Sequence, residues 1–415
     1  MPFPNHLPIP REVLTIAETL EAAGFDTWCV GGAVRDNLLG LENKDFDLTT
    51  AARPEDVQRV FKRTIPIGVD HGTVAVLDRH RKPHEVTTFR RDVTTDGRHA
   101  TVEFGVSLDE DLARRDFTIN AIAHHPLKHE WRDPCDGAGD LERKLIRAVG
   151  DPTERFREDY LRILRALRFA ARFGFEIELA TWEAAAAHAH GLTNLSAERV
   201  RDEWFKGLET AQRPSELVEL WGEVGALRVW LQELGSGERG AGPDDVRIID
   251  GMGVRDPVLI TAYLSRDPEA TLRRLRCSNS EIERGAAIQR HRSRWPDPTN
   301  DVSVRHWMAE VGQAAADLVE IARLEGRDIG DGVARVRSAG PPLCLADLVV
   351  SGNELMALGI AQGPAVGDIL RGLLDVVLDD PTLNTKSALL ERARAMISGG
   401  PAPRSRLLSE RRHKE

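Results

Sequence analysis

The pattern of hydrophobic and polar positions divides the chain into a first third of short segments and a remainder of longer helical ones. Residues 9–23 carry apolar side chains at helical spacing and are followed by Gly24, which predicts an amphipathic helix. From there to about Ala123, short apolar runs bounded by turn residues predict strands. These runs lie at 28–30, 45–48, 72–77 and 84–90. The first third is therefore expected to form a small mixed α/β unit.

Two polar stretches interrupt this pattern. Residues 90–103 are polar and include Asp-Gly at 96–97, which predicts a mobile loop. Ser107 and Glu110 have the spacing of a capping box, so a helix is expected to begin there.

From about Leu141 the sequence pattern changes and predicts long helices. Asp151-Pro152 opens one that ends at Gly174, and its polar residues form a stripe along one side. The stripe comprises Asp159, Arg162, Arg165, Arg168 and Arg172, while Leu161, Leu164 and Leu167 face elsewhere. Residues 235–245 are rich in glycine and mark a loop or a domain junction. The predicted fold class is α+β, a mixed-sheet unit followed by an all-helical remainder.

Composition places the chain among globular proteins of several domains. Its 415 residues are too many for one compact core. Its contents of 41% hydrophobic and 29% charged residues are ordinary for a globular protein. The first ten residues lack the basic and apolar regions of a signal peptide, and the four cysteines are widely separated without a CxxC pair. We therefore expect a cytoplasmic, reducing location without a disulfide framework or a structural zinc.

The formal net charge of −10 argues against a protein that coats nucleic acid in general. Arginines nevertheless cluster at 143–172 and at 273–294, and the end of the chain is basic. These arginines can be read as solvated helix faces, or as a local basic surface that binds one folded RNA.

A glycine pair and two aspartates suggest chemistry on a phosphate. Gly31 and Gly32 follow a predicted buried strand and open a short helix, whose free N–H groups suit an anion. Asp45 and Asp47 flank Phe46, so in a strand both carboxylates share one face while Phe46 enters the core. Two such carboxylates suit a pair of Mg²⁺ ions in an in-line attack on a nucleoside triphosphate. Neither the P-loop nor the GxGxxG pattern is matched.

Three motifs together resemble the class II tRNA nucleotidyltransferase and bacterial poly(A) polymerase family. They are GGAVRD with KDFDL at 31–48, RRDFTINA at 114–121, and EDYLRILR at 158–165. The resemblance implies a nucleotidyltransferase head, a helical neck, a helical body and a helical tail that binds tRNA, followed by a basic disordered end. The expected bounds are 1–140, 141–235, 236–300, 301–400 and 401–415.

The resemblance also implies a set of site residues. It implies that Asp45 and Asp47 bind two Mg²⁺, with Glu85 as a third acidic group. Gly31, Gly32 and Arg35 are implied to bind phosphates, while Arg114, Arg115 and Asp116 contact the triphosphate and ribose with support from Asn120. Arg98 is implied to belong to a flexible loop. The alternatives are an exposed strand glutamate at 85 and an ordinary surface loop around 98. Glu198 and Arg199 match a later helical motif and are expected to hold the neck.

Asp159 and Arg162 are implied to select the nucleobase, assisted by Arg165 and Arg168. A carboxylate accepts the exocyclic amine of cytosine or adenine and repels the carbonyl of uracil or guanine, and a guanidinium donates to the ring nitrogen. The alternative is a solvated face with Asp159 and Arg162 as a weak ion pair.

The function implied is template-independent addition of CCA to the tRNA 3′ end from CTP and ATP. Three alternatives stay open: a bacterial poly(A) polymerase, an enzyme that adds only CC or only A, and a non-catalytic tRNA-binding protein of the same fold. The tyrosine of EDYLR, the DGRH loop and the lack of a long basic extension favour the first function, and intact Asp45 and Asp47 disfavour a binding module.

Overall fold

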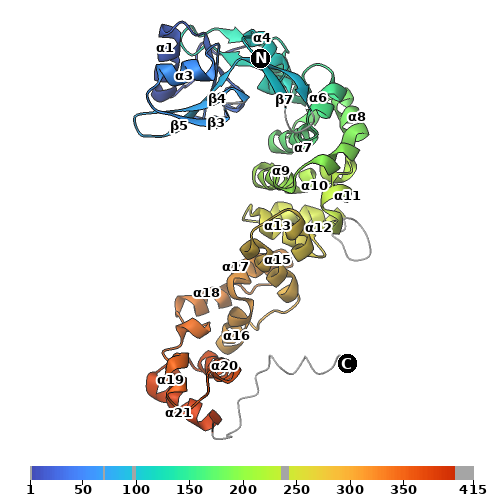
Figure 1. The fold of residues 1–415 in the computed structure, drawn as a ribbon. Helices are drawn as coiled ribbons and strands as arrows, with labels where there is room; N and C mark the ends of the chain where they lie inside the picture. The colour runs from blue at the N-terminus through green and yellow to red at the C-terminus, as the bar shows by residue number, and fades with distance from the viewer. Residues whose placement is uncertain (1, 69–70, 96–99, 235–242, 398–415) are drawn as a thin grey trace. The chain divides into compact units, whose positions relative to one another are not determined.

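A computed structural model describes residues 2–68, 71–95, 100–234 and 243–397, and Figure 1 draws its ribbon. The chain divides into two compact units. The first holds residues 1–250 and 274–276, and the second holds 251–273 and the chain from 277 onward. The predicted head and neck thus lie together in the first unit, and the basic end at 401–415 lies outside the described residues.

A seven-stranded mixed sheet forms the centre of the head. Its strand order is β3-β4-β5-β2-β1-β8-β9. The strands are β1 (Thr27–Val30), β2 (Asp47–Thr50), β3 (Thr64–Gly68), β4 (Thr73–Leu77), β5 (Pro83–Thr88), β8 (Ala123–His124) and β9 (Trp131–Arg132). β2 is antiparallel to β1 and parallel to β5. The mixed sheet and the predicted strands are confirmed, except that β2 begins at Asp47 and leaves Asp45 and Phe46 just before the strand.

Short helices surround this sheet. The helices are α1 (Arg11–Ala22), α2 (Gly32–Leu38), α3 (Pro54–Val60), α4 (Leu108–Ala113) and α5 (Gly137–Arg143). α1 and α3 pack against each other and against the sheet (Figure 1). Burial of apolar side chains from both layers supplies the driving force. Leu48 and Val86 from the strands, with Phe46 just before β2, share one core with Val13 and Ile16 of α1. The capping box of α4 is confirmed, since the Ser107 hydroxyl accepts from the Glu110 N–H at 3.3 Å.

Residues 90–95 and 100–103 do not form the predicted loop, while residues 96–99 lie outside the described residues. Residues 90–95 and 100–103 lie in two strands, β6 (Arg90–Thr95) and β7 (Ala100–Phe104), which pair antiparallel. Residues 92–95 read Asp-Val-Thr-Thr and residues 100–102 read Ala-Thr-Val, and the β-branched side chains in both stretches favour strands over loop. The polar composition concealed this preference. Arg98 lies outside the described residues.

The helical part of the first unit follows the head. It comprises α6 (Pro152–Glu158), α7 (Leu161–Phe173), α8 (Leu179–His188), α9 (Ala197–Thr210), α10 (Pro214–Glu223), α11 (Ala226–Trp230) and α12 (Pro243–Ile248), with a two-stranded parallel pair of β10 (Leu145–Ile146) and β11 (Glu176–Ile177). The single helix predicted from Pro152 to Gly174 is wrong. The chain breaks at Asp159, whose backbone is extended with φ −155° and ψ 105°.

Helices joined by loops make up the described part of the second unit. Its helices are α13 (Pro257–Leu264), α14 (Pro268–Arg274, whose last residue belongs to the first unit), α15 (Asn279–His291), α16 (Asp301–Val311), α17 (Ala315–Leu324), α18 (Gly330–Ser338), α19 (Gly352–Met356), α20 (Pro364–Asp379) and α21 (Lys386–Ile397). Leu355, Leu373, Val377 and Leu389 form the core of its last segment.

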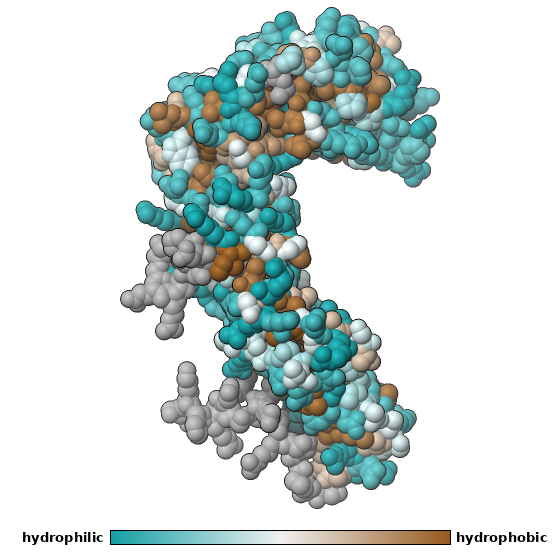
Figure 2. All heavy atoms as spheres, turned by 180° about the vertical axis from the view of Figure 1, so that it is seen from behind, coloured by the Kyte–Doolittle hydropathy of each residue, from teal (hydrophilic) through white to brown (hydrophobic). Residues whose placement is uncertain are grey.

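Hydrophilic side chains cover most of the face drawn in Figure 2, with smaller groups of hydrophobic residues between them. Among the described residues, every helix is too short or too polar to cross a membrane.

Candidate active site

Gly31 lies at the centre of the candidate site. It ends β1 and precedes α2 with φ +76° and ψ −139°, a conformation that residues with a Cβ rarely adopt. A Cβ at this position would lie 3.5 Å from Nη1 of Arg115 and 3.5 Å from Oδ2 of Asp47. The space that a side chain at Gly31 would fill is therefore bordered by a guanidinium and a carboxylate from distant parts of the sequence.

Replacing Gly31 with alanine should cost about 1–3 kcal/mol of folding free energy, because the backbone conformation is strained for any L side chain. Urea unfolding measures this loss. Gly32→Ala is the matched control, since Gly32 begins a helix and a Cβ there would lie 3.6 Å from Nη2 of Arg35, an ordinary contact. Its free energy of unfolding should stay within about 1 kcal/mol of the wild type. Equal stability of both alanine variants would contradict the strain at Gly31.

Three carboxylates meet beside this glycine. Phe46 is 2% exposed while Asp45 and Asp47 are exposed, as the alternation predicts, although the strand begins only at Asp47. Glu85 precedes Val86, the β5 partner of Leu48, and so lies level with Asp47 on the neighbouring strand. Although Asp47 is accessible to solvent, desolvation by the surrounding protein and the charges of Glu85 and Asp45 raise the pKa of Asp47 to about 6. Crowded carboxylate oxygens of this kind are the donors that a hard cation such as Mg²⁺ prefers.

Arg114 and Arg115 are held by a buried carboxylate at the end of α4. Asp111 accepts from Arg114 Nε at 3.0 Å and from Arg115 Nη2 at 3.2 Å. Burial alone would raise the pKa of Asp111, but the two arginines lower it below its ordinary value. Nε of Arg115 is buried without a hydrogen-bond partner within the described residues. Arg115 therefore keeps a donor for an anion next to Gly31.

Arg35 is a buried connector. It is 3% exposed and donates to Asp36 through Nε and Nη2, at 2.9 and 2.6 Å. Its Nη1 donates to Oδ1 of Asn120 at 2.5 Å, and its guanidinium lies 4.9 Å from the ring centres of Phe169 and Phe173. All three nitrogens of Arg35 therefore donate within the protein and the guanidinium is buried, so the geometry favours a structural role for Arg35.

Asp116 continues this chain of contacts. Its Oδ1 accepts from the amide of Asn120 at 2.9 Å, and its Oδ2 accepts from Arg165 Nε at 2.8 Å. Burial alone would raise the pKa of Asp116, but the charge of Arg165 and these hydrogen bonds lower it to about 2. The carboxylate is ionised and fixed, and it joins the RRDFTINA segment to α7.

The predicted arginine stripe is largely turned inward. Arg168 is 8% exposed and its Nε donates to Oε2 of Glu203 on α9 at 2.5 Å. Arg172 reaches back to Asp36 at 2.9 Å. The alternative of a solvated helix face is therefore wrong for these residues, because their charges are compensated inside the unit. We call the series Asp36, Arg35, Asn120, Asp116, Arg165, Glu203 and Arg168 the buried polar network.

Asp159 and Arg162 do not form the ion pair considered for them. Asp159 lies in the extended link between α6 and α7, and its Oδ2 accepts from Nη2 of Arg199 at 2.7 Å. Arg162 donates to Glu158 at 2.6 Å and to the carbonyl of Arg114 at 3.3 Å. The break before α7 separates the two side chains and gives each its own partner.

Four residues of this region carry contacts that the motifs alone did not reveal: Asp36, Asp111, Glu158 and Glu203. Each lies inside or beside a recognised motif, and each is a carboxylate next to arginines. The signal available in the sequence was this pairing of charge. Their partners could not be assigned without the fold.

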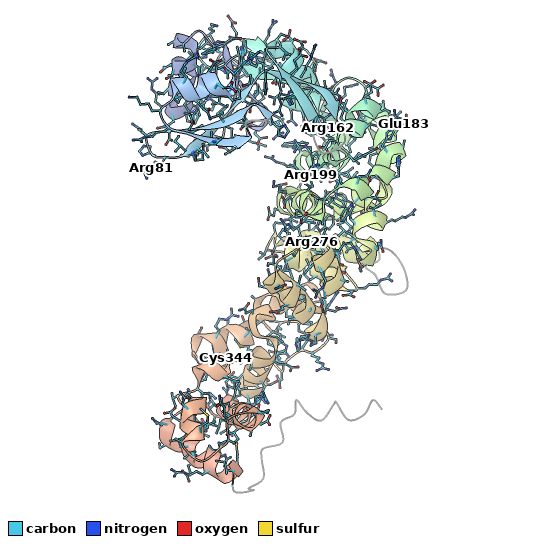
Figure 3. The ribbon with its side chains drawn as sticks, viewed as in Figure 1. Arg81, Arg162, Glu183, Arg199, Arg276 and Cys344 are labelled. Atoms are coloured by element: carbon cyan, nitrogen blue, oxygen red, sulfur yellow. The ribbon has the colours of Figure 1, made fainter. Side chains whose placement is uncertain are left out.

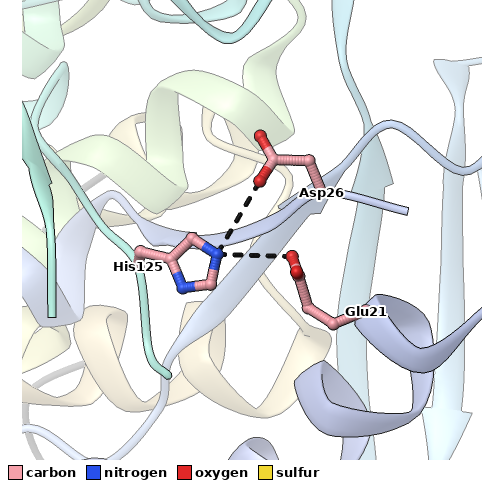
Figure 4. A group of neighbouring side chains, drawn as sticks. All are labelled: Glu21, Asp26 and His125. Atoms are coloured by element: carbon pink, nitrogen blue, oxygen red, sulfur yellow. Dashed lines mark ion pairs between the residues drawn. The ribbon is translucent and has the colours of Figure 1, made fainter. Parts of the chain in front are cut away.

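Glu21, Asp26 and His125 form a second group with metal-ligand spacing (Figure 4). It lies at the opposite end of β1 from Gly31. Nδ1 of His125 accepts from the N–H groups of Leu127 and Lys128, so in the neutral ring Nε2 carries the hydrogen and faces Glu21 at 3.3 Å. Burial lowers the pKa of His125 and favours this neutral ring, and the positive charge beside the two carboxylates comes from Lys128, 3.7 Å from Glu21 and 3.8 Å from Asp26.

Comparisons with known proteins agree with this geometry. Residues 27–147 match the family described as poly A polymerase head domain, and residues 174–236 match the probable RNA and SrmB-binding site of polymerase A. A CCA-adding enzyme of Latilactobacillus sakei is 35% identical over 92% of this chain and 97% of its own. One of Limosilactobacillus fermentum is 34% identical over 92% and 96%.

Solved structures show the same likeness. The CCA-adding enzyme of Bacillus stearothermophilus in complex with CTP superposes with a TM-score of 0.79 and 31% identity, covering 94% of this chain and 98% of that one. The Thermotoga maritima CCA-adding enzyme complexed with tRNA has a TM-score of 0.62 at 20% identity, over 94% and 96%, and shows the shared fold.

Proposed function

The chain belongs to the family of CCA-adding enzymes, and on that premise we propose that its candidate site attaches CMP, CMP and AMP to a tRNA 3′ end. The observation that carries the proposal is the convergence of Asp47, Glu85 and Arg115 around Gly31. Carboxylates for a cation and a buried cationic donor lie next to the same open position of a glycine backbone. This is what a triphosphate substrate requires.

The reaction joins the 3′-oxygen of the RNA to the α-phosphorus of the nucleotide. The bond from the α-phosphorus to the bridging oxygen breaks, pyrophosphate leaves, and the 3′-hydroxyl loses its proton. Asp45, Asp47 and Glu85 would hold Mg²⁺, which when bound neutralises phosphate charge and makes the 3′-hydroxyl more acidic. The carboxylates themselves fix where that cation lies relative to the glycine turn.

The chain's own cations and amides bind the triphosphate. The N–H groups after Gly31 open α2, and the absence of a side chain lets a phosphate approach them closely. Arg115 offers its buried Nε, and Arg114 is held alongside by Asp111. Asp116 and Asn120 act indirectly. They bind Arg165 and Arg35 and thereby align the head with α7.

Asp159 and Arg162 select the base in this proposal. Asp159 accepts the exocyclic amine of cytosine or adenine, and Arg162 donates to the ring nitrogen beside it. Arg165 and Arg168 assist by fixing α7 through Asp116 and Glu203. Because protein side chains read the base, no nucleic-acid template is needed.

A tRNA transcript that lacks its last three nucleotides tests the proposal. With Mg²⁺, CTP alone should extend it by two residues, and CTP plus ATP by three, as resolved on a sequencing gel. Arrest at two with both nucleotides, or action only on tRNA that ends in CC, would identify a partial enzyme. A long ladder with ATP alone would identify a poly(A) polymerase, and tight tRNA binding without extension would support the non-catalytic alternative.

A further inference from the structure

The carboxylate of Asp159 is not placed by a helix. It lies in the extended link between α6 and α7, and its side chain is 27% exposed. A side chain in such a link can adopt several staggered rotamers unless contacts select one. A carboxylate that discriminates between an amine and a carbonyl must present its lone pairs in one direction. Its orientation therefore has to come from its neighbours.

Two contacts fix that orientation. Oδ1 accepts from the N–H of Leu161 at 3.0 Å, at the start of α7. Oδ2 accepts from Nη2 of Arg199 at 2.7 Å. With the first contact alone, the Asp159 carboxylate can still rotate about its side-chain bonds. The second holds the other oxygen from a helix 40 positions along the chain.

Arg162 is held by different groups. Its Nη1 donates to Glu158 and to the carbonyl of Arg155, and its Nη2 donates to the carbonyl of Arg114. Figure 3 labels Arg162 on α7 and Arg199 on α9, the helix that packs against α7. Arg199 therefore acts on Asp159 without disturbing the partners of Arg162.

We propose that Arg199 is a positioning residue for nucleobase selection, which fixes Asp159 so that uracil and guanine are rejected. The inference rests on the proposed role of Asp159. With both oxygens held, the outward lone pairs meet the amine of cytosine or adenine and repel the carbonyl of uracil or guanine. Without Arg199, the carboxylate can turn away, and the repulsion that excludes the wrong base is lost.

The test measures single-nucleotide incorporation of CTP, UTP, ATP and GTP by Arg199→Ala, Arg199→Lys and Arg201→Ala. Arg201 is two residues along the same helix and pairs with its neighbour Asp202, so its variant is the matched control. Arg199→Ala should raise KM for CTP and ATP and lower the ratio of kcat/KM for CTP over UTP by about tenfold. Arg199→Lys should recover part of that ratio, and Arg201→Ala should leave it unchanged.

Loss of kcat for all four nucleotides at a constant ratio would overturn the inference and mark Arg199 as merely structural. An unchanged ratio with unchanged KM would overturn it as well. Asp159→Ala separates this failure from that of the proposed function. If Asp159→Ala loses discrimination and Arg199→Ala keeps it, only the positioning inference fails, whereas wild-type discrimination in Asp159→Ala would remove the base-selecting role itself. Circular dichroism melting of each variant shows whether the fold is retained.

Discussion

Alanine at Asp47 is expected to reduce CMP addition by about 10³-fold or more, because the loss of a cation ligand removes several kcal/mol of transition-state stabilisation. Asp47 is the carboxylate beside Gly31, and Glu85 lies level with it on the neighbouring strand. We therefore expect that neither Glu85 nor Asp45 replaces Asp47 at this place. Asp45→Ala should have a similar effect. Single-turnover assays with CTP and truncated tRNA measure the rate, and filter binding measures tRNA affinity, which should stay within about threefold.

Glu42→Gln is the matched control for this experiment. Glu42 lies three residues before Asp45, its side chain is 73% exposed, and it pairs with Lys44. Its replacement should leave the rate of addition at the wild-type level. Full activity in Asp47→Ala or in Asp45→Ala would refute the assignment of these carboxylates to the cation. A parallel loss of tRNA binding would mean instead that the head had unfolded.

Alanine at Glu203 is expected to lower the free energy of unfolding by about 3–5 kcal/mol, because it leaves Arg168 as an uncompensated buried charge. The Arg168 and Glu203 side chains are 10% and 6% exposed. Glu203 also lies 3.8 Å from Arg165, so part of the field that holds Arg165 against Asp116 is lost as well. Urea unfolding followed by tryptophan fluorescence is a suitable measurement, since Trp204 is the next residue and is fully buried.

Glu209→Ala provides the reference, since Glu209 is exposed on the same helix, and it should change the free energy of unfolding by less than about 0.5 kcal/mol. The double variant Glu203→Leu with Arg168→Met removes both charges and should regain much of the lost stability. If the single variant Glu203→Ala were as stable as wild type, the pair would not be a buried charge compensation. If the double variant were less stable than Glu203→Ala, apolar side chains could not replace the Arg168–Glu203 ion pair.

Much of the head could be predicted from the sequence because its signals are local. Alternation around Phe46 correctly predicted that Phe46 is buried and that Asp45 and Asp47 are exposed, and the capping box at Ser107 placed the start of α4. The parallel pairing of β2 with β5, which brings Glu85 level with Asp47, joins segments 38 residues apart. Only the resemblance to known proteins suggested Glu85.

The failures share a physical cause. Periodicity described residues 152–174 as one helix, but Asp159 breaks it by accepting the N–H of Leu161 and the guanidinium of Arg199. Such a side chain competes with helical hydrogen bonding, and its distant partner decides the outcome. The alternative of a solvated arginine stripe also failed, because it inferred exposure from polarity. Glu203 and Asp116 make burial of those charges tolerable, and neither can be recognised as a partner from spacing.

The buried polar network has a consequence for how the sequence can change over time. Each of its charged members neutralises another, so replacement of one alone is penalised, while joint replacement of a pair is tolerated. Relatives of this protein should therefore differ at the Arg168 and Glu203 positions together, or at neither. The same holds for Asp116 and Arg165. Substitutions at these positions should therefore be correlated in pairs, whereas substitutions at exposed arginines on the surface should be independent of one another.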